Sequence, residues 1–220
     1  MVKSIRGMQT NDVPKGLYES GIKQGDEFDV NDYFVATPNL SMQEGYTLDY
    51  VFHIDGLGSY PIIAARPVDQ PPYTEEKDVP EGSEFASYWN YIEIQDTEQG
   101  YFEYMALLIM ANQFYLVWHA NYNDTDVICN REGVDAIIAD INDGDFGIEF
   151  DSKQMKQIRS MNNIEPLAKL VDTTAIVEII TFSKWGGFYR MTYTIDRAFP
   201  HTIIDVQEEN IVPYDCGIMF

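Results

Sequence analysis

The chain has 220 residues, of which 45% are hydrophobic and 14% aromatic, and its formal net charge is −22. This composition is too apolar for an intrinsically disordered chain, and it provides enough side chains for one sizeable core. The negative charge repels nucleic acid and anionic membranes and attracts basic partners, which argues against direct nucleic-acid or membrane binding. We therefore expect a single globular domain over residues 1–220.

The first third of the chain predicts an irregular arm followed by three strands. Residues 1–26 are rich in Gly, Asp and Asn with little periodicity, which predicts an irregular N-terminal arm. Residues 27–36 are expected to form a short strand. Residues 46–55 are rich in Tyr, Val, Phe and Ile and predict a stronger one. The glycine-rich turn after it allows residues 60–68 to pair with it as a hairpin.

An acidic, proline-rich loop is predicted over residues 67–85, which contain four prolines, six acids and one lysine. Residues 87–96 follow it and alternate between apolar and polar side chains, which predicts a strand.

The stretch at 101–120 is almost wholly apolar, and Glu103 is its one formally charged residue. A helix spanning a membrane would place this glutamate, together with Asn112 and His119, in or near lipid at a large energetic cost. We expect instead a central hairpin that turns at Asn112 and is buried on both faces. That register pairs His119 with Tyr104.

Two helices are predicted after this hairpin, at residues 130–142 and 152–161, because each has apolar residues spaced three and four apart. Asn130 is expected to cap the first, and Asp151 or Ser152 the second.

The remaining elements are strands. Residues 146–150, 173–183, 188–196 and 201–207 each match a strand pattern. A two-residue turn at Gly186-Gly187 would place Phe182 opposite Met191.

These elements together predict an α+β fold: a mainly antiparallel sheet built from hairpins, with two helices inserted after the central hairpin.

Motifs for chemistry are scarce. The three histidines lie far apart, and neither a zinc motif nor a phosphate-binding loop occurs, so we expect no cofactor and no metal. The turn at 140–151 has the oxygen-rich character of a calcium loop. However, Gly144 and Asp145 stand where a ligand and the glycine should be, so an acidic turn is the preferred interpretation.

The charge pattern gives the main functional hypothesis. Residues 51–150 carry −16 of the net −22, and residues 69–103 alone carry −9. We expect a non-enzymatic acidic protein that recognises a basic protein surface, such as an inhibitor or immunity-type partner of a protein that acts on nucleic acid. The expected partner-binding residues are acids of this region: Glu75, Glu76, Asp78, Glu81, Glu84, Glu93 and Glu103.

Two alternatives remain open. An enzyme or small-molecule binder could build a pocket from scattered residues, with His119 as the first candidate because it lies at an expected strand end. An oligomeric structural subunit could use the many tyrosines at an interface. The N-terminus has no apolar segment typical of a secretory signal, so Cys129 and Cys216 are expected to be reduced and the protein cytoplasmic.

Overall fold

The computed structural model describes residues 1–79, 85–122, 124–143 and 147–217. The α-helices are α1 (Val2–Met8), α2 (Lys15–Ser20), α3 (Tyr33–Ala36), α4 (Glu98–Met110), α5 (Arg131–Asp143) and α6 (Ser152–Ser160). The strands are β1 (Leu40–Met42), β2 (Tyr46–His53), β3 (Gly58–Pro67), β4 (Ile92–Ile94), β5 (Val117–Trp118), β6 (Thr125–Ile128), β7 (Leu167–Val171), β8 (Thr174–Ser183), β9 (Gly187–Asp196) and β10 (Ile203–Pro213). Short 3-10 helices are η1 (Val30–Asp32), η2 (Glu76–Asp78), η3 (Phe85–Tyr91) and η4 (His119–Tyr122).

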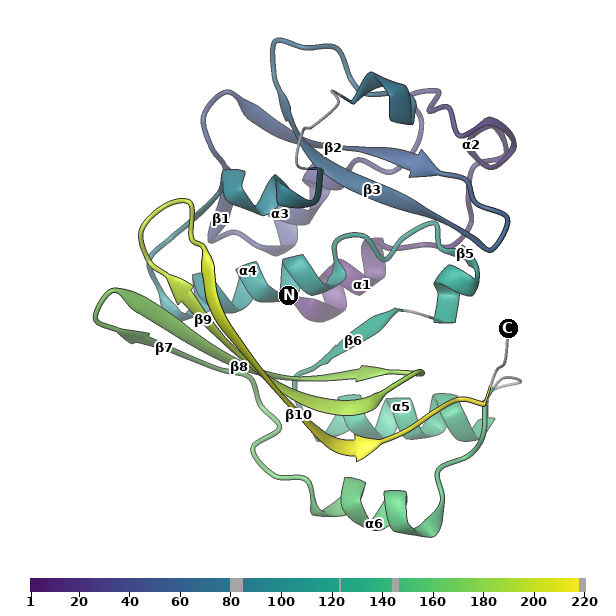
Figure 1. Cartoon of the computed structure of the whole chain (residues 1–220), viewed down its shortest axis with the longest axis vertical. Helices are drawn as coiled ribbons and strands as arrows, with labels where there is room; N and C mark the ends of the chain where they lie inside the picture. The colour runs from purple at the N-terminus through teal and green to yellow at the C-terminus, as the bar shows by residue number, and fades with distance from the viewer. Residues whose placement is uncertain (80–84, 123, 144–146, 218–220) are drawn as a thin grey trace.

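The elements stack in layers, as Figure 1 shows. A sheet of order β2-β3-β5 lies at one end, and a five-stranded sheet of order β10-β9-β8-β6, with β7 also paired to β8, lies at the other. Helix α4 runs between the two sheets, and α5 and α6 cover the outer face of the larger sheet. All strand pairs among the described residues are antiparallel, and the predicted α+β class is confirmed.

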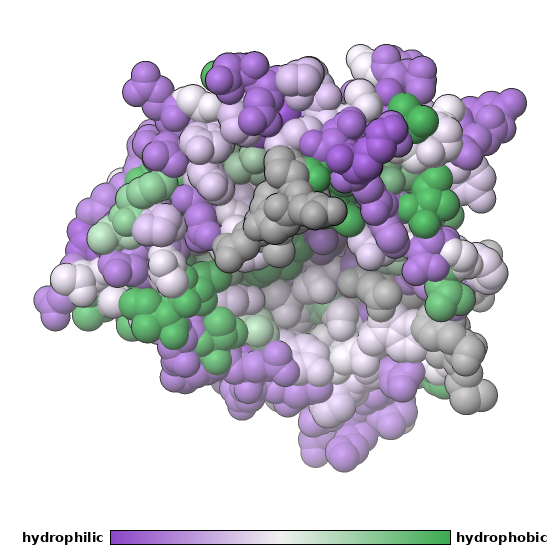
Figure 2. Space-filling model, turned by 45° about the horizontal axis from the view of Figure 1, so that its top comes forward, coloured by the Kyte–Doolittle hydropathy of each residue, from purple (hydrophilic) through white to green (hydrophobic). Residues whose placement is uncertain are grey.

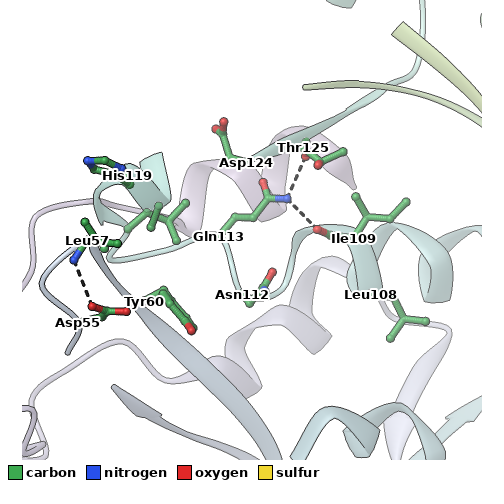
Figure 3. A pocket seen from close by; sticks show the side chains of 13 residues that line it. Asp55, Leu57, Tyr60, Leu108, Ile109, Asn112, Gln113, His119, Asp124 and Thr125 are labelled. Carbon is green, nitrogen blue, oxygen red and sulfur yellow. Dashed lines mark hydrogen bonds between the residues drawn. The ribbon is translucent and has the colours of Figure 1, made fainter. Parts of the chain in front are cut away.

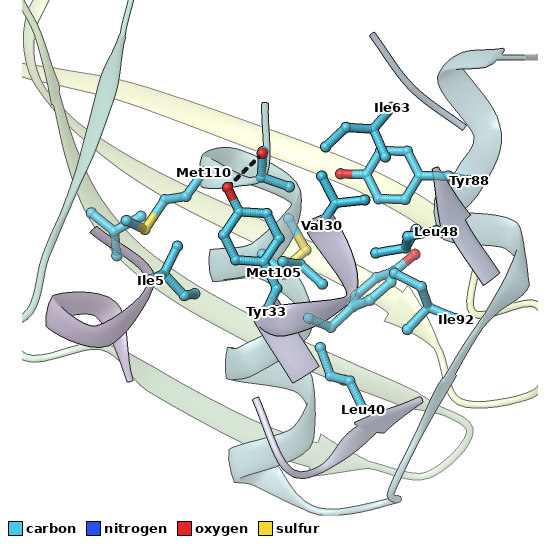
Figure 4. Packing of buried hydrophobic residues seen from close by; sticks show 14 of the residues in the cluster. Ile5, Val30, Tyr33, Leu40, Leu48, Ile63, Tyr88, Ile92, Met105 and Met110 are labelled. Carbon is cyan, nitrogen blue, oxygen red and sulfur yellow. Dashed lines mark hydrogen bonds between the residues drawn. The ribbon is translucent and has the colours of Figure 1, made fainter. Parts of the chain in front are cut away.

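Two hydrophobic cores follow from this arrangement. The larger core packs β2, β3 and the inner face of β8 around α4, and Figure 4 shows part of it. In it, the hydroxyl of the fully buried Tyr33 donates a hydrogen bond to the carbonyl of Ala111, at 2.9 Å. The second core lies on the other face of the large sheet, where Ile180 and Phe182 of β8 meet Val134 of α5.

Several predicted elements are confirmed. Strands β2 and β3 pair from Tyr46 with Pro67 to His53 with Tyr60, within the bounds expected of the hairpin. Helices α5 and α6 occupy the two predicted helical segments. Asn130 accepts the Gly133 N–H at 3.0 Å, as expected of a cap, and Asp151 caps α6.

The hairpin predicted at 101–120 is wrong, because this stretch begins inside helix α4. Thr97 caps the helix by accepting the Gly100 N–H at 3.0 Å. Helix α4 packs against protein on several sides, so apolar residues cover nearly its whole circumference. Its sequence therefore does not show the spacing of apolar residues that indicates an amphipathic helix. The expected strand pairing of His119 with Tyr104 is wrong as well, because Tyr104 lies in α4 and His119 in η4. The Tyr104 hydroxyl donates a hydrogen bond to the carbonyl of His201.

Two other predicted strands are wrong. Residues 27–36 form η1 and α3, where Asp29 accepts the Asn31 N–H at 2.9 Å and starts the helical turn. Residues 87–91 of the predicted strand at 87–96 belong to the 3-10 helix η3, and only Ile92–Ile94 form a strand. In residues 27–36, the short-range hydrogen bond of Asp29 prevails over strand propensity. Residues 148–150 are not a strand either, and residue 146 of that predicted element lies outside the described part.

The register of β8 with β9 differs from the predicted one. Phe182 pairs with Phe188, because the turn uses the three residues Lys184, Trp185 and Gly186. Gly187 has a φ of 91°, and a Cβ there would overlap the backbone of Val212 in β10. The glycine is therefore required at the start of β9, where the prediction had assigned it to the turn.

The N-terminal segment and the acidic loop are both anchored by Asp49, which is buried in β2. Its carboxylate contacts Lys23 Nζ at 2.5 Å and Arg66 Nε at 2.7 Å, and it accepts the Tyr73 N–H at 2.9 Å. The predicted irregular arm over residues 1–26 contains α1 and α2, each with one fully buried residue. It is an integral part of the fold, since those residues join the larger core.

Glu103 offers a direct test of the α4 assignment. It is 2% exposed, and its carboxylate accepts the Asn39 N–H and the Asn39 side-chain amide, each at 2.9 Å. Glu103→Ala should lower the free energy of unfolding by about 2–4 kcal/mol, because it leaves these donors without an acceptor. Glu93→Ala, at an exposed position on β4, should change it by less than about 0.5 kcal/mol. Urea unfolding measures both, and equal small effects would contradict the buried position of Glu103.

Candidate functional site

A cavity of about 540 Å³ lies between the C-terminal end of α4, the β2–β3 turn and the segment of η4 and β6. This volume is in the range of ligand-binding pockets. Its apolar lining residues include Leu57, Tyr60, Leu108, Ile109 and Leu116. Its polar lining residues are Asp55, Asn112, Gln113, His119, Asp124 and Thr125. In Figure 3, Asp124, Thr125 and His119 lie along one side, and Asp55, Tyr60 and Leu108 lie along the other.

A second cavity, of about 490 Å³, lies beyond Gln113, Leu116 and Asp124, which line both. The two cavities differ in charge. Arg6 and Lys184 line the second, together with acidic residues. In the first, the described lining residues include two aspartates and neither lysine nor arginine.

Hydrogen bonds hold the wall between the cavities in place. Arg6 binds the Asp126 carboxylate at 2.6 Å and donates to Gln113 Oε1 at 3.0 Å. The Gln113 amide in turn donates to the carbonyls of Ile109, at 2.7 Å, and Thr125, at 3.0 Å. These bonds join α1, the end of α4 and β6, so Asp124 is carried on a fixed wall.

Asp124 is the electrostatically unusual residue of this wall. Burial raises the pKa of its carboxyl, and the nearby carboxylates of Asp126 and Asp140 raise it further. Lys184 and Arg6 lower this pKa by a smaller amount. Carboxyl groups with a perturbed pKa are concentrated in the cavities of functional sites. A cationic ligand that binds beside Asp124 would favour its ionised form, which burial disfavours.

An exposed apolar rim adjoins the first cavity. It consists of Leu57, Tyr60 and Trp118, whose side chains are 64%, 39% and 62% exposed. Trp118 pairs with Gly58, and the His119 N–H donates to the Leu57 carbonyl at 3.3 Å, so the rim is tied together by backbone contacts. Large apolar side chains grouped at the surface are typical of an interaction site.

The backbone next to this rim is strained. Trp118 has a φ of 53° and Tyr115 a φ of 52°, in the left-handed region that aromatic residues rarely adopt. Tyr115 is buried, and its hydroxyl accepts the Phe28 N–H at 3.1 Å, so packing holds it. Trp118 has the same strained backbone, but its side chain is exposed, so burial does not compensate for the strain. Strained residues of this kind are concentrated at functional sites.

The acids predicted from sequence to bind a partner lie in different surroundings. Glu103 is buried, is bound by Asn39 and is unavailable to a partner, contrary to the expectation. The prediction places it on a strand of the hairpin, whereas it lies inside helix α4. Glu93 is exposed on β4. Glu81 and Glu84 lie outside the described residues.

The other predicted acids make contacts within the loop or to β2. Glu75 contacts Lys77 at 2.6 Å, and Glu76 contacts His53 of β2 at 2.7 Å. Asp78 accepts the Thr74 hydroxyl and N–H, at 2.6 and 2.8 Å, and these bonds lower the pKa of its carboxyl. These three acids therefore stabilise the loop, while their charge still adds to the field around the molecule.

The sequence predicts part of this candidate site. His119, the first candidate for a pocket, does line the cavity, and its ring contacts that of Trp118, with centroids 4.9 Å apart. Asp124 belongs to residues 121–126, whose asparagines and aspartates predict only a loop. The contribution of Asp55 and Tyr60 had no sequence signal, because these residues meet Asp124 only through the fold.

Comparison with protein families, with curated proteins and with solved structures finds no match to this chain. In the described ranges, no helix combines the length and apolar character needed to cross a bilayer. The same ranges contain no group of three or more His, Cys, Asp or Glu residues placed to hold a metal ion. The calcium-like turn at 140–151 is only partly described, since residues 144–146 fall outside those ranges.

Asp124→Asn should stabilise the protein at pH 7. Because the folded protein raises the pKa of Asp124, its ionised form costs stability at any pH above that pKa. The variant should therefore have a higher Tm at pH 7, and the gain should vanish as the pH falls below about 4, where aspartate is protonated in both states. Thermal unfolding across this pH range measures the effect.

Asp126→Asn is the matched control, two residues away. It breaks the ion pair with Arg6 and should lower the stability by up to about 1 kcal/mol. If Asp124→Asn lowers the Tm as Asp126→Asn does, Asp124 is a structural residue.

Proposed function

We propose that this chain is a non-enzymatic binding protein that recognises a basic surface of another protein, using the first cavity and the apolar rim beside it. The proposal depends on one observation: carboxylates in the first cavity lie beside exposed apolar side chains. A cavity lined by Asp55 and Asp124 lies next to Leu57, Tyr60 and Trp118, which are exposed.

The charge of the whole molecule favours such a partner. At a net charge of −22, the protein attracts a basic surface over distances of about 8–10 Å at physiological salt and accelerates the encounter. Figure 2 shows hydrophilic residues over most of one face, with hydrophobic residues in separate groups between them. Long-range attraction thus comes from many acids, including those of the loop, whereas contact is concentrated at few places.

The rim supports protein recognition in particular. Tyrosine and tryptophan are enriched among the residues that contribute most to binding energy at protein interfaces, where they fill pockets and exclude water. Tyr60 and Trp118 present such side chains beside carboxylates. A partner with basic residues next to an apolar one would match this pattern.

The proposal includes the class of partner and the compartment. Proteins that act on nucleic acid present lysines and arginines to phosphates, so an acidic inhibitor or immunity-type protein would cover the same surface. A cytoplasmic location is part of the proposal, and the two free cysteines, Cys129 and the buried Cys216, are compatible with a reducing compartment.

A short arginine-rich peptide serves as the probe, with a glutamate-rich peptide of equal length as the negative control. We expect the arginine-rich peptide to bind and its affinity to fall at least about tenfold between about 50 and about 500 mM NaCl, because salt screens the attraction. Biolayer interferometry gives both the affinity and the association rate. Absence of binding at low salt contradicts the proposal.

Charge reversal locates the site. Asp55→Lys should slow association and weaken binding more than Glu165→Lys, which makes the same charge change at an exposed position before β7. Equal effects of the two variants would show that only net charge matters and would contradict a site at the cavity. Urea unfolding of both variants confirms that each is folded.

A further inference from the structure

We infer that the partner inserts the side chain of one arginine into the first cavity, with its guanidinium group against the carboxylate of Asp124. This inference rests on the proposed function and specifies the ligand chemistry of the same site. It follows from the walls of the cavity, from the neighbours of Asp124 and from the rim.

The walls match a side chain that is apolar along its stem and cationic at its end. Leu57, Leu108, Ile109 and Leu116 provide an apolar surface for methylene groups, and the aspartates provide acceptors. Long basic side chains bury their stems in this way while the charged group reaches a polar partner. A wholly apolar side chain would bury the Asp124 carboxylate further without donating a hydrogen bond to it, which is unfavourable.

The neighbouring cations are engaged elsewhere. Arg6 binds Asp126 at 2.6 Å and is held by Gln113, while Lys184 lies 3.9 Å from Asp140. Within the described part of the chain, no ion pair closer than 4.0 Å includes Asp124. Its carboxylate is therefore the acceptor in this wall that an incoming cation can use.

The aromatic rim favours arginine over lysine. A guanidinium group is planar and weakly hydrated, so it stacks on aromatic rings and donates two parallel hydrogen bonds to a carboxylate. Tyr60 lines the cavity and Trp118 stands beside it, and both are exposed. An ammonium group is more strongly hydrated and gains less from such surroundings.

A double-mutant cycle tests the contact. The probe is a short, glycine-flanked peptide with a single arginine, and the second probe replaces that arginine with citrulline, which has nearly the same shape and no charge. Binding to the full-length chain and to Asp124→Asn is followed by NMR titration. We expect the wild-type protein to bind the arginine peptide about tenfold or more tightly than the citrulline peptide, and the variant to lose most of this preference.

Asp135→Asn is the control, because it removes an equal charge from an exposed residue of α5 that lines neither of the two cavities. It should retain the preference for arginine. A preference that survives in Asp124→Asn, or is lost equally in both variants, overturns the inference. If the arginine-rich peptide meanwhile binds wild type with the expected dependence on Asp55, the proposed function stands and only the arginine contact with Asp124 fails.

Discussion

Helix α4 packs against both sheets, and its burial on several sides is the constraint on which the rest of the structure depends. Tyr101, Tyr104 and Leu107 are fully buried, and they belong to the core that also contains residues of β2 and β8. Because the helix has little exposed surface, the elements around it must complete its burial. The N-terminal segment contributes Ile5 and Leu17 to the same core, so it cannot be a separate arm.

The end of this helix also determines where the candidate site lies. After α4, the chain turns at Asn112, and Gln113 contacts Arg6 of α1 and the carbonyl of Thr125 in β6. These contacts place Asp124 at the junction of elements that are distant in sequence. The site therefore combines a rigid wall with an exposed rim, and the raised pKa of Asp124 shows that the wall places a carboxyl group where its ionised form is disfavoured.

The sequence predicts well those elements that have one buried face. Helices α5 and α6 carry a clear period, because water lies on one side and protein on the other. Strand β2 is buried on both faces, and its hairpin with β3 is predicted instead by its aromatic and β-branched residues and by the glycine-rich turn after it. Helix α4 has no such period, and Glu103 is grouped with the partner-binding acids by charge alone, although it is buried inside this helix. The cavity could not be predicted, since Asp55, Tyr60 and Asp124 meet only when the β2–β3 turn reaches the segment after α4.

The central claim is that contact occurs at the first cavity and that the acidic loop contributes only long-range attraction. Mapping where the arginine-rich peptide binds on the protein tests this claim most directly. Amide and indole NMR signals of isotope-labelled protein would be followed during titration with the arginine-rich peptide. The account predicts that the largest shifts occur at Leu57, Tyr60, Trp118 and Asp124. Shifts concentrated at Glu75, Glu76 and Asp78, with the cavity residues unchanged, would contradict it.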